Sequence, residues 1–335
     1  MNDDLILLGH GSGGALSHRL LDDLILPVLS DRSAEQNDAA LLTIGQSRLA
    51  FTTDGYVVDP PLFPGGTIGS LAVHGTVNDL AMMGARPLWL SCALIIEEGL
   101  ERQLLADILA DLRRAADGAG VRVVTGDTKV VPRGKADRIF ITTSGVGVIE
   151  HSLAIHGGGA RPGDRIILSG TLGDHGMAVM AAREGLPLDG LRSDSAPLWS
   201  LVREMLAEAG EALHLLRDPT RGGVATTLKE LARQSGLLFT IDEAALAVTP
   251  QVRGLCGILG LDPLYVANEG KLLACVAPEA AEAVLARMKR HPLGERAAII
   301  GTVDEGEAGR VRMRTVVGGM RMVEMLAGEQ LPRIC

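Results

Sequence analysis

The order of strand-like and helix-like stretches restricts this chain to a small set of folds. Two pairs of short apolar stretches are each joined by a tight glycine-containing turn, which predicts β-hairpins within residues 41–53 and 310–326. Elsewhere, strand-like stretches are separated by longer amphipathic stretches such as Glu101–Gly118, whose leucines recur at helical spacing. Hairpins mixed with crossover helices favour α+β sandwiches over a doubly wound parallel sheet. We therefore expect the α+β class.

The same periodicities predict the individual elements of the chain. The expected helices lie at 17–29, 67–83, 101–118, 177–184, 197–208, 223–235 and 279–289. The expected strands outside the hairpins lie at 89–96, 121–124, 139–149, 165–169, 237–241, 271–277 and 298–303.

A chain of 335 residues is long enough for two domains. The glycine-rich run 156–163 is the best linker candidate, because it separates two α/β units of similar size. We expect an N-terminal domain at 1–155 and a second at 156–327. Residues 328–335 should form a mobile tail, because Pro332 neither continues a helix nor joins a central strand.

Composition excludes several classes of protein. Aromatic residues make up only 2% of the chain, so the core must consist of aliphatic side chains and methionine. The net charge is -9 and no basic run offsets it, which argues against nucleic acid and anionic membranes as partners. No apolar run approaches the length of a membrane span, and the start of the chain lacks the pattern of a signal peptide. We expect a cytoplasmic location in which thiols stay reduced.

A glycine-rich segment, Gly9–Gly14, follows a short apolar run and precedes a predicted helix. It matches the dinucleotide-binding pattern G-x-G-x-x-G, but that site needs an acidic residue after the second strand. Here Asp38 comes before the strand, and the strand turns into a hairpin. A backbone cradle for phosphate fits this segment better, and a plain turn stays open as the alternative.

Four aspartates, each next to an apolar element, are the stronger chemical signal. They are Asp38, Asp54, Asp79 and Asp127. A single aspartate in such a place is ordinarily a cap or turn residue. Four of them with few basic neighbours fit carboxylates that hold Mg²⁺ against a polyphosphate.

The segment 217–223, Arg-Asp-Pro-Thr-Arg-Gly-Gly, stands before a predicted helix. A helix N-terminus favours an anion, the glycines allow close approach, and Arg221 could pair with a phosphate. The alternative is an N-capping turn, with Thr220 or Asp218 as the cap, which would leave the doubled glycine unexplained.

The last residue of the chain is a cysteine, Cys335. Eight extended residues would let its thiol reach roughly 26–29 Å. A free thiol has a pKa of about 8.5, so activation must come from a partner or a cleft rather than from the tail. Glu269 and Lys129 flank strand-like stretches, and they become acid–base candidates only if the fold places them near a reacting group.

Together these motifs resemble the PurM-like ATP-binding family, and within it the enzymes of [NiFe]-hydrogenase maturation. The matching segments are 9–14, 37–40, 51–55, 78–84, 126–129, 218–223, 268–270 and the terminal Pro-Arg-Ile-Cys at 332–335. They span nearly the whole chain. The aspartate motifs are shared with selenophosphate synthetases and thiamine-phosphate kinases, whereas the terminal motif is specific to the maturation enzymes. Selenophosphate synthetases carry a reactive cysteine near the glycine-rich segment, and this chain has none there.

The resemblance implies a two-domain α/β sandwich that forms a homodimer and binds ATP and Mg²⁺ in a cleft. By position, it implies catalytic roles for Cys335, Glu269 and Lys129, and metal binding by Asp38, Asp54, Asp79 and Asp127. It implies ATP binding by Gly11, Ser12, Gly13, Gly14, Asn78, Asp218, Thr220, Arg221 and Gly222.

The reaction implied by the resemblance is the ATP-dependent dehydration of a carbamoyl group carried on Cys335. A carbamoyltransferase, HypF, would load the thiol. The resulting thiocyanate would supply cyanide to iron on a HypC–HypD complex.

Two other functions remain as alternatives. One is a different PurM-like kinase or synthetase for a small molecule, such as a selenophosphate synthetase. The other is a non-catalytic scaffold that transfers a metal through Cys335.

Overall fold

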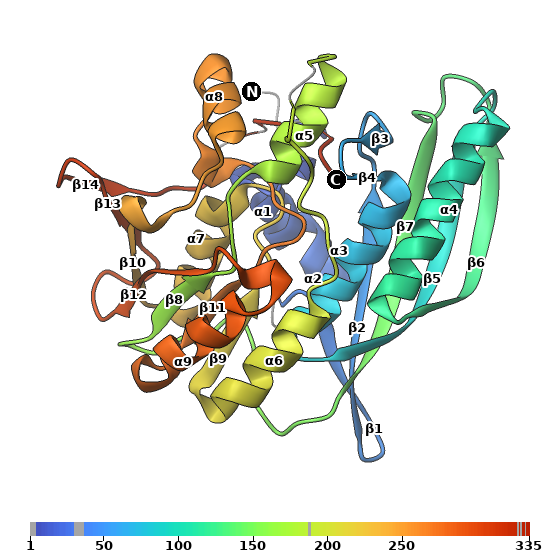
Figure 1. The fold of residues 1–335 in the computed structure, drawn as a ribbon. Helices are drawn as coiled ribbons and strands as arrows, with labels where there is room; N and C mark the ends of the chain where they lie inside the picture. The colour runs from blue at the N-terminus through green and yellow to red at the C-terminus, as the bar shows by residue number, and fades with distance from the viewer. Residues whose placement is uncertain (1–4, 30–36, 187–188, 327, 329, 332) are drawn as a thin grey trace.

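Two β-sheets, each accompanied by helices, are arranged around a central helix in the computed structural model (Figure 1). The structure describes residues 5–29, 37–186, 189–326, 328, 330–331 and 333–335. The expected α+β class is confirmed. The expected linker, 156–163, contains no helix or strand and runs between the last strand of the first sheet and the first strand of the second.

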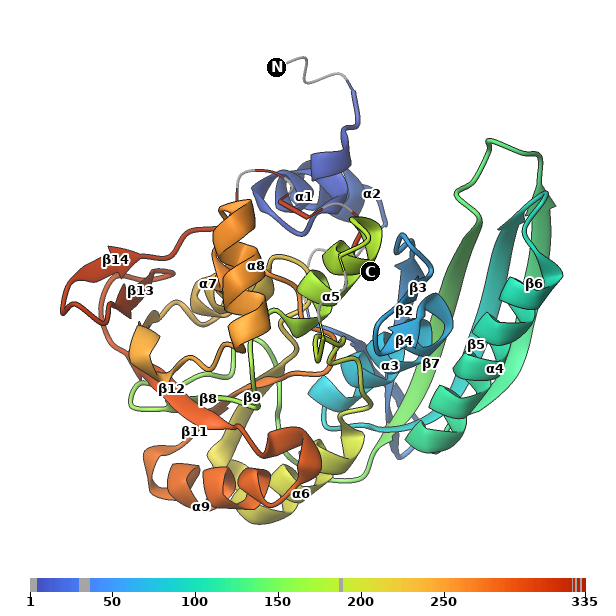
Figure 2. The ribbon, with the colours of Figure 1, turned by 45° about the horizontal axis from the view of Figure 1, so that its top comes forward.

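The N-terminal sheet has five strands in the order β1-β2-β7-β5-β6. The strands are β1 (Ala40–Ile44), β2 (Ser47–Tyr56), β5 (Arg86–Glu97), β6 (Arg122–Val131) and β7 (Ile139–Ile149). A separate small ribbon pairs β3 (Leu62–Phe63) with β4 (Gly66–Thr67). Only β5 and β6 run parallel in the larger sheet, because helix α4 (Arg102–Ala119) connects them as a crossover. Helices α3 (Ile68–Met82) and α4 cover one face of this sheet (Figure 2).

The C-terminal sheet has seven strands in the order β14-β13-β10-β12-β8-β11-β9. The strands are β8 (Arg165–Leu168), β9 (Leu213–Arg217), β10 (Leu238–Asp242), β11 (Leu273–Val276), β12 (Ala298–Asp304), β13 (Val311–Arg314) and β14 (Met320–Met322). One face packs against α7 (Gly223–Ser235), and the other packs against α6 (Trp199–Ala209) and α9 (Pro278–Lys289). Helices α5 (Asp174–Arg183) and α8 (Pro250–Leu259) pack on each other beside this sheet.

The predicted elements largely agree with the observed ones, because their apolar periodicity matches their burial. The predicted helix 67–83 is α3, and Thr67 caps it by accepting hydrogen bonds from the amides of Gly69 and Ser70. The predicted helix 17–29 forms as one helical run, α1 (Ala15–Leu20), η2 (Leu21–Ile25) and α2 (Leu26–Leu29), with a π-helical turn in its middle.

The sequence analysis missed the short ribbon of β3 and β4, strand β9 and helix α8, and it predicted β6 too short. Strand β9 is short and buried, so it shows no alternation of apolar and polar residues. Helix α8 contains two glycines, Gly254 and Gly257, which lower its helix propensity. Strand β6 continues to Val131 through Gly126 and Asp127, two residue types that are uncommon in strands.

Helix α3 connects the two halves of the molecule. Thirteen of its fifteen residues are buried. Its N-terminal part packs in the core of the first sheet, and Ala81 and Met82 pack in the core between the second sheet and α6. The space beside this helix is therefore bounded by both sheets.

Among the described residues, none of the helices combines the length and the hydrophobicity that crossing a membrane requires.

Loss of the α3 cap should measurably destabilise the protein. Thr67 also donates a 2.8 Å hydrogen bond to Asp111 of α4, so Thr67→Ala removes contacts within α3 and between helices. We expect a loss of about 1–2 kcal/mol in the free energy of unfolding. Urea denaturation measures this loss, with the exposed Ser152→Ala as control. Equal stability of the two variants would contradict the prediction.

Candidate active site

The end of the chain lies inside the molecule. Ile334 is only 3% exposed and packs in the core that contains α3 and the first sheet. The Val57 amide donates a 3.1 Å hydrogen bond to the Cys335 carbonyl, and the Asp59 amide donates a 3.2 Å bond to the Arg333 carbonyl. The tail therefore pairs with the segment that follows β2, and the Cys335 thiol lies in a cavity.

This cavity, of about 240 Å³, is bounded by both domains and by the N-terminal segment, and we call it the acidic cavity. Its lining residues are Gly13, Asp38, Asp54, Gly55, Tyr56, Gly75, Asp79, Arg217, Asp218, Thr220, Arg221, Thr227, Glu230, Glu269 and Cys335. A second, more apolar cavity shares Arg221 and Cys335 with it and is lined further by Gly11, Ser12, Gly14 and Gly222.

Three of the predicted carboxylates converge in the acidic cavity. Oxygens of Asp38, Asp79 and Asp218 lie within 4.8 Å of one another. They come from the start of β1, from α3 and from the end of β9, so only the packing of both sheets on α3 brings them together. Asp54 of β2 lines the same cavity and accepts a 3.2 Å hydrogen bond from the Tyr56 hydroxyl.

This donor set fits a divalent cation. Hard cations such as Mg²⁺ take carboxylate oxygens, and three of them are already gathered here. The residues that would hold the ion are Asp38, Asp79 and Asp218, with Asp54 beside them. Asp218, which was expected to bind ATP, thus lies with the predicted metal ligands.

Burial disfavours the ionised form of the carboxyl groups in the cavity. Burial raises the pKa of Asp38, Asp54 and Asp79, and neighbouring carboxylates raise those of Asp38 and Asp79 further. Burial likewise raises the pKa of Asp218 to about 6, and Arg217 counteracts the shift. A bound cation would relieve this repulsion, which is the electrostatic argument for a metal site.

Arg217 forms ion pairs with carboxylates of the acidic cavity. Arg217 pairs with Asp38 at 2.8 Å and with Glu230 at 3.1 Å. His18 of the N-terminal helical run contacts Glu230 at 2.9 Å, and this carboxylate raises the pKa of His18. These contacts fix Asp38 and tie the N-terminal segment to the cavity.

Glu269, a predicted acid–base residue, lies in the same cavity as Cys335. Its side chain is buried and lines the acidic cavity together with Cys335. Its Oε1 atom has no hydrogen-bond partner among the described residues. Burial raises its pKa well above the usual value, and the nearby Asp218, Asp194 and Asp54 raise it further. Such a group takes up a proton strongly once it is ionised.

The Cys335 thiol is neutral in the cavity. Burial raises its pKa to about 12, Arg221 counteracts the shift, and Glu269 and Asp54 reinforce it. The cavity therefore does not activate the thiol, contrary to one of the two sources of activation that we expected. Activation by a partner stays as the prediction.

The glycine-rich segment and the Arg221 loop lie against each other. Arg221 donates a 2.9 Å hydrogen bond to the Gly11 carbonyl. A Cβ atom on Gly13 would lie 3.2 Å from the Arg221 Cβ, so the glycine permits this approach. Thr220, Arg221 and Gly222 directly precede α7, as the sequence predicts, and Gly222 is its N-cap.

Two predicted site residues lie elsewhere in this chain. Asp127 and Lys129 are exposed on β6, where they pair with each other at 2.7 Å, and neither lines the acidic cavity.

Asn78 does not line the acidic cavity. Its amide donates to the carbonyls of Ala196 and Glu269 at 3.0 and 3.2 Å, and it accepts from the Leu198 amide at 2.8 Å. Asn78 therefore holds the backbone of Ala196, Leu198 and Glu269 in place.

Sequence reasoning missed several residues that shape the site. Arg217 is the first residue of the recognised segment 217–223 but was given no role, and its position next to Asp218 was the available signal. Tyr56, His175 and Asp194 gave no signal, because they act through contacts with residues of other segments: Thr76 for Tyr56, Ile334 for His175 and Glu269 for Asp194.

The fold and the cavity define a two-domain protein of the AIR synthase related class. Residues 36–149 match the N-terminal domain of AIR synthase related protein, and residues 161–314 match its C-terminal domain. Among curated proteins, carbamoyl dehydratase HypE of Cupriavidus necator is 52% identical over 98% of this chain and 94% of that protein. The Escherichia coli HypE is 45% identical over 98% and 99%. The chain belongs to the HypE family of hydrogenase maturation enzymes.

Solved structures agree with this assignment. A HypE structure in complex with ATP is 50% identical and has a TM-score of 0.84 over 99% of this chain and all of that one. A HypE–HypF complex gives a TM-score of 0.86 at 44% identity, over 92% of this chain and 99% of that one. A ThiL structure at 21% identity, with a TM-score of 0.71, shares the fold.

Metal binding should depend on pH through the acidic cavity. Because the pKa of Asp218 is raised to about 6, this group is ionised above that pH and protonated below it. A metal must displace protons at low pH, so we expect Mg²⁺ affinity to weaken as the pH falls through about 6. Titration calorimetry with Mg²⁺ alone at several pH values measures this.

Asp218→Asn is the matched control. It should bind Mg²⁺ more weakly above a pH of about 6, should approach the unaltered protein below it, and should show a shallower pH dependence. An affinity of the unaltered protein that does not change with pH would contradict the metal assignment.

Proposed function

We propose that this chain is an ATP-dependent carbamoyl dehydratase that acts on a carbamoyl group bound to its own Cys335. The observation that carries the proposal is the placement of the Cys335 thiol in one cavity with Glu269 and the aspartate cluster. The names of the relatives and the ATP complex of a family member support it.

The chemistry requires removal of an oxygen atom from an amide-like group. Transfer of the terminal phosphoryl group of ATP to the carbamoyl oxygen would convert a poor leaving group into phosphate. The C–O bond then breaks while two protons leave the nitrogen, and the product on the sulfur is a thiocyanate. When bound, Mg²⁺ would neutralise phosphate charge beside Asp38, Asp79 and Asp218.

Two side chains of the cavity, those of Glu269 and Arg221, would take part in this reaction. Glu269 is the base that the cavity offers to the nitrogen, since its carboxyl is buried beside Cys335 and its Oε1 is unpartnered among the described residues. Arg221 lines the same cavity as Cys335, and its guanidinium would supply positive charge for phosphate. Lys129 stays a predicted second participant.

Loading of the thiol has to happen elsewhere. A thiol with a pKa of about 12 is a poor nucleophile, and a bulky donor enzyme cannot enter a cavity of about 240 Å³. The tail would therefore leave the cavity to receive its carbamoyl group from a HypF carbamoyltransferase, the partner seen in the HypE–HypF complex. The finished cyano group would be delivered to iron on a HypC–HypD complex.

Mass spectrometry of the C-terminal peptide tests the dehydration directly. After carbamoylation, addition of ATP and Mg²⁺ should remove the mass of one water from the Cys335 adduct. Glu269→Gln keeps the size of the side chain and loses the base, so it should slow this loss by about 10²–10⁴-fold. An adduct of unchanged mass in the unaltered protein would defeat the proposal.

Removal of Cys335 separates this function from the alternatives. Cys335→Ala should abolish ATP turnover that depends on carbamoylation. A small-molecule kinase or synthetase would keep its full activity in this variant. A metal-transfer scaffold would lose metal but would never have needed ATP.

We also propose a homodimer through the open face of the first sheet. Strand register places Leu42, Phe51, Trp89 and Ile95 on one face, and each of them is 39–45% exposed. Within the described residues no helix packs on this face, since α3 and α4 lie on the other one (Figure 2). An apolar face of this kind favours association with a second copy.

Asp127 and Lys129 share this face, because Lys129 pairs in register with Ile95. In a dimer they would approach the second copy. This is the arrangement in which their predicted roles could be fulfilled.

Charges on the open face should separate the two copies. Phe51→Glu and Trp89→Glu each place a carboxylate where apolar side chains would be buried, so both should give monomers in light scattering. Ile258→Glu, on the exposed side of α8, is the control and should leave the mass unchanged. Dimers that persist in both face variants would contradict this interface.

A further inference from the structure

The tail is held in the cavity mainly through its backbone. Three successive carbonyls, those of Arg333, Ile334 and Cys335, each accept a hydrogen bond from the body of the protein. Two of the donors are backbone amides, as described above. Two further donors are side chains of α5: His175 contacts the Ile334 carbonyl at 2.9 Å, and Arg183 donates to the Arg333 carbonyl at 2.9 Å.

His175 lies in the core, where its ring reaches the Ile334 carbonyl. It is fully buried, and the Phe63 ring meets it edge-on with centroids 5.4 Å apart. A carbonyl oxygen only accepts, so Nε2 must carry the hydrogen that Ile334 receives. Nδ1 then accepts from the Ser193 hydroxyl at 2.8 Å, and burial lowers the pKa of the ring and keeps it neutral.

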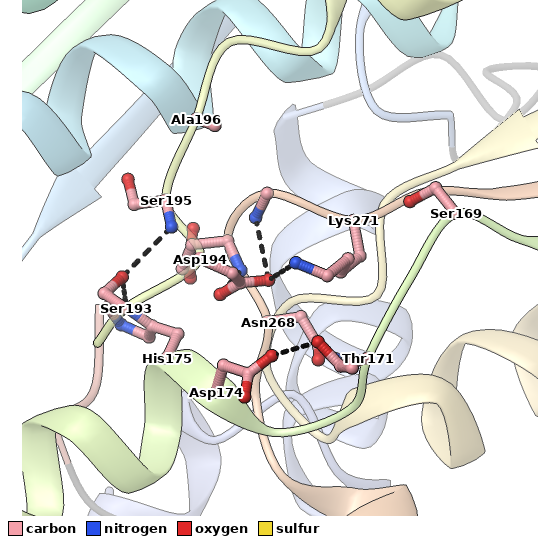
Figure 3. A network of polar contacts seen from close by, with 12 residues as sticks. Ser169, Thr171, Asp174, His175, Ser193, Asp194, Ser195, Ala196, Asn268 and Lys271 are labelled. Atoms are coloured by element: carbon pink, nitrogen blue, oxygen red, sulfur yellow. Dashed lines mark hydrogen bonds and ion pairs between the residues drawn. The ribbon is translucent and has the colours of Figure 1, made fainter. Parts of the chain in front are cut away.

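The segment that orients His175 also positions Glu269. Directly after Ser193, the carboxylate of Asp194 accepts hydrogen bonds from the amides of Glu269 and Gly270 at 3.1 and 3.3 Å. It also pairs with Lys271 at 2.9 Å (Figure 3). A Cβ atom on Gly270 would lie 1.8 Å from the Asp194 carbonyl oxygen, so only glycine permits this approach.

Helix α3 fixes the other side of this segment. His74 of α3 contacts the Ser195 hydroxyl at 2.9 Å, and Asn78 binds the carbonyls of Ala196 and Glu269. The residues 193–196 are therefore held from three sides.

We propose that His175 is a positioning residue, a latch that holds the Ile334 carbonyl and so keeps Cys335 docked beside Glu269. Ser193 contacts His175, and the next residue, Asp194, binds the amide of Glu269. The two neighbouring residues therefore fix the positions of His175 and Glu269 relative to each other. The catalytic meaning of the latch rests on the proposed dehydration of Cys335, but the docking itself does not.

Loss of the latch should have opposite effects on the two stages of the cycle. Loading needs the thiol outside the cavity, so weaker docking favours it. Dehydration needs the thiol inside, so weaker docking slows it. A general loss of structure would instead impair both stages.

Thiol labelling measures docking without reference to activity. The rate at which a maleimide modifies Cys335, followed on the C-terminal peptide, reports how often the tail leaves the cavity. We expect His175→Leu to raise this rate about threefold to tenfold, as the loss of one net hydrogen bond implies. His175→Gln, whose amide can still donate near the Nε2 position, should restore most of the protection.

Two further variants guard against a folding defect at His175. Arg183→Met removes the second side-chain donor and should raise labelling in the same direction. Arg113→Met, on the exposed side of α4, is the matched control and should label at the rate of the unaltered protein.

A single-turnover experiment tests the catalytic role. Protein carbamoylated with cyanate is mixed with ATP and Mg²⁺, and the loss of water from the Cys335 adduct is timed. His175→Leu should slow this loss about threefold to tenfold, and His175→Gln should recover it.

The outcomes are distinct. Unchanged labelling in both His175→Leu and Arg183→Met would overturn the latch. Faster labelling with an unchanged dehydration rate would overturn its positioning role. Faster labelling in a protein whose adduct never loses water would leave the docking latch in place and defeat the proposed function instead.

Discussion

The burial of α3 between two sheets is the constraint on which the rest of the structure depends. One end of the helix packs with α4 and the first sheet, and the other packs with α6 and the second sheet. Small residues make this possible: a Cβ atom on Gly69 would lie 2.4 Å from the Ile108 carbonyl oxygen, and one on Gly75 would lie 2.2 Å from the Tyr56 hydroxyl. Asp79 and Asn78 then point in different directions from one turn, the first toward the metal cluster and the second toward the backbone of Glu269.

That arrangement concentrates acidic groups in a place that opposes their ionisation. Burial is the largest cause of the raised pKa at Asp38, Asp79, Asp218 and Glu269, and the carboxyls add to one another's shifts. Buried charges without partners destabilise a fold, so such a cluster is best explained by a ligand that brings positive charge. Cys335 shares this environment, which keeps its thiol neutral.

Local pattern predicted most of the secondary structure, and it failed where burial or polarity hid the pattern. Helix α7 was predicted with both ends correct, since a doubled glycine precedes its apolar face and Gly236 follows it. The strand predicted at 121–124 ended too early, because Gly126 and Asp127 are uncommon in strands, although both lie in the middle of the exposed strand β6. The candidate site was predicted as a set of motifs, and within one chain the structure unites most of them but leaves Asp127 and Lys129 outside.

The sequence by itself determined the class of fold and the acidic motifs, and it predicted a role for Cys335, because periodicity and residue chemistry are local properties that can be read along the chain. Only the tertiary structure decided which groups meet. It placed the thiol in one cavity with Glu269, left Asn78 out of the lining of that cavity, and brought His175 to the Ile334 carbonyl and Asp194 to the Glu269 amide. Those relations join residues far apart in the sequence, and their energies depend on burial, which no local pattern encodes.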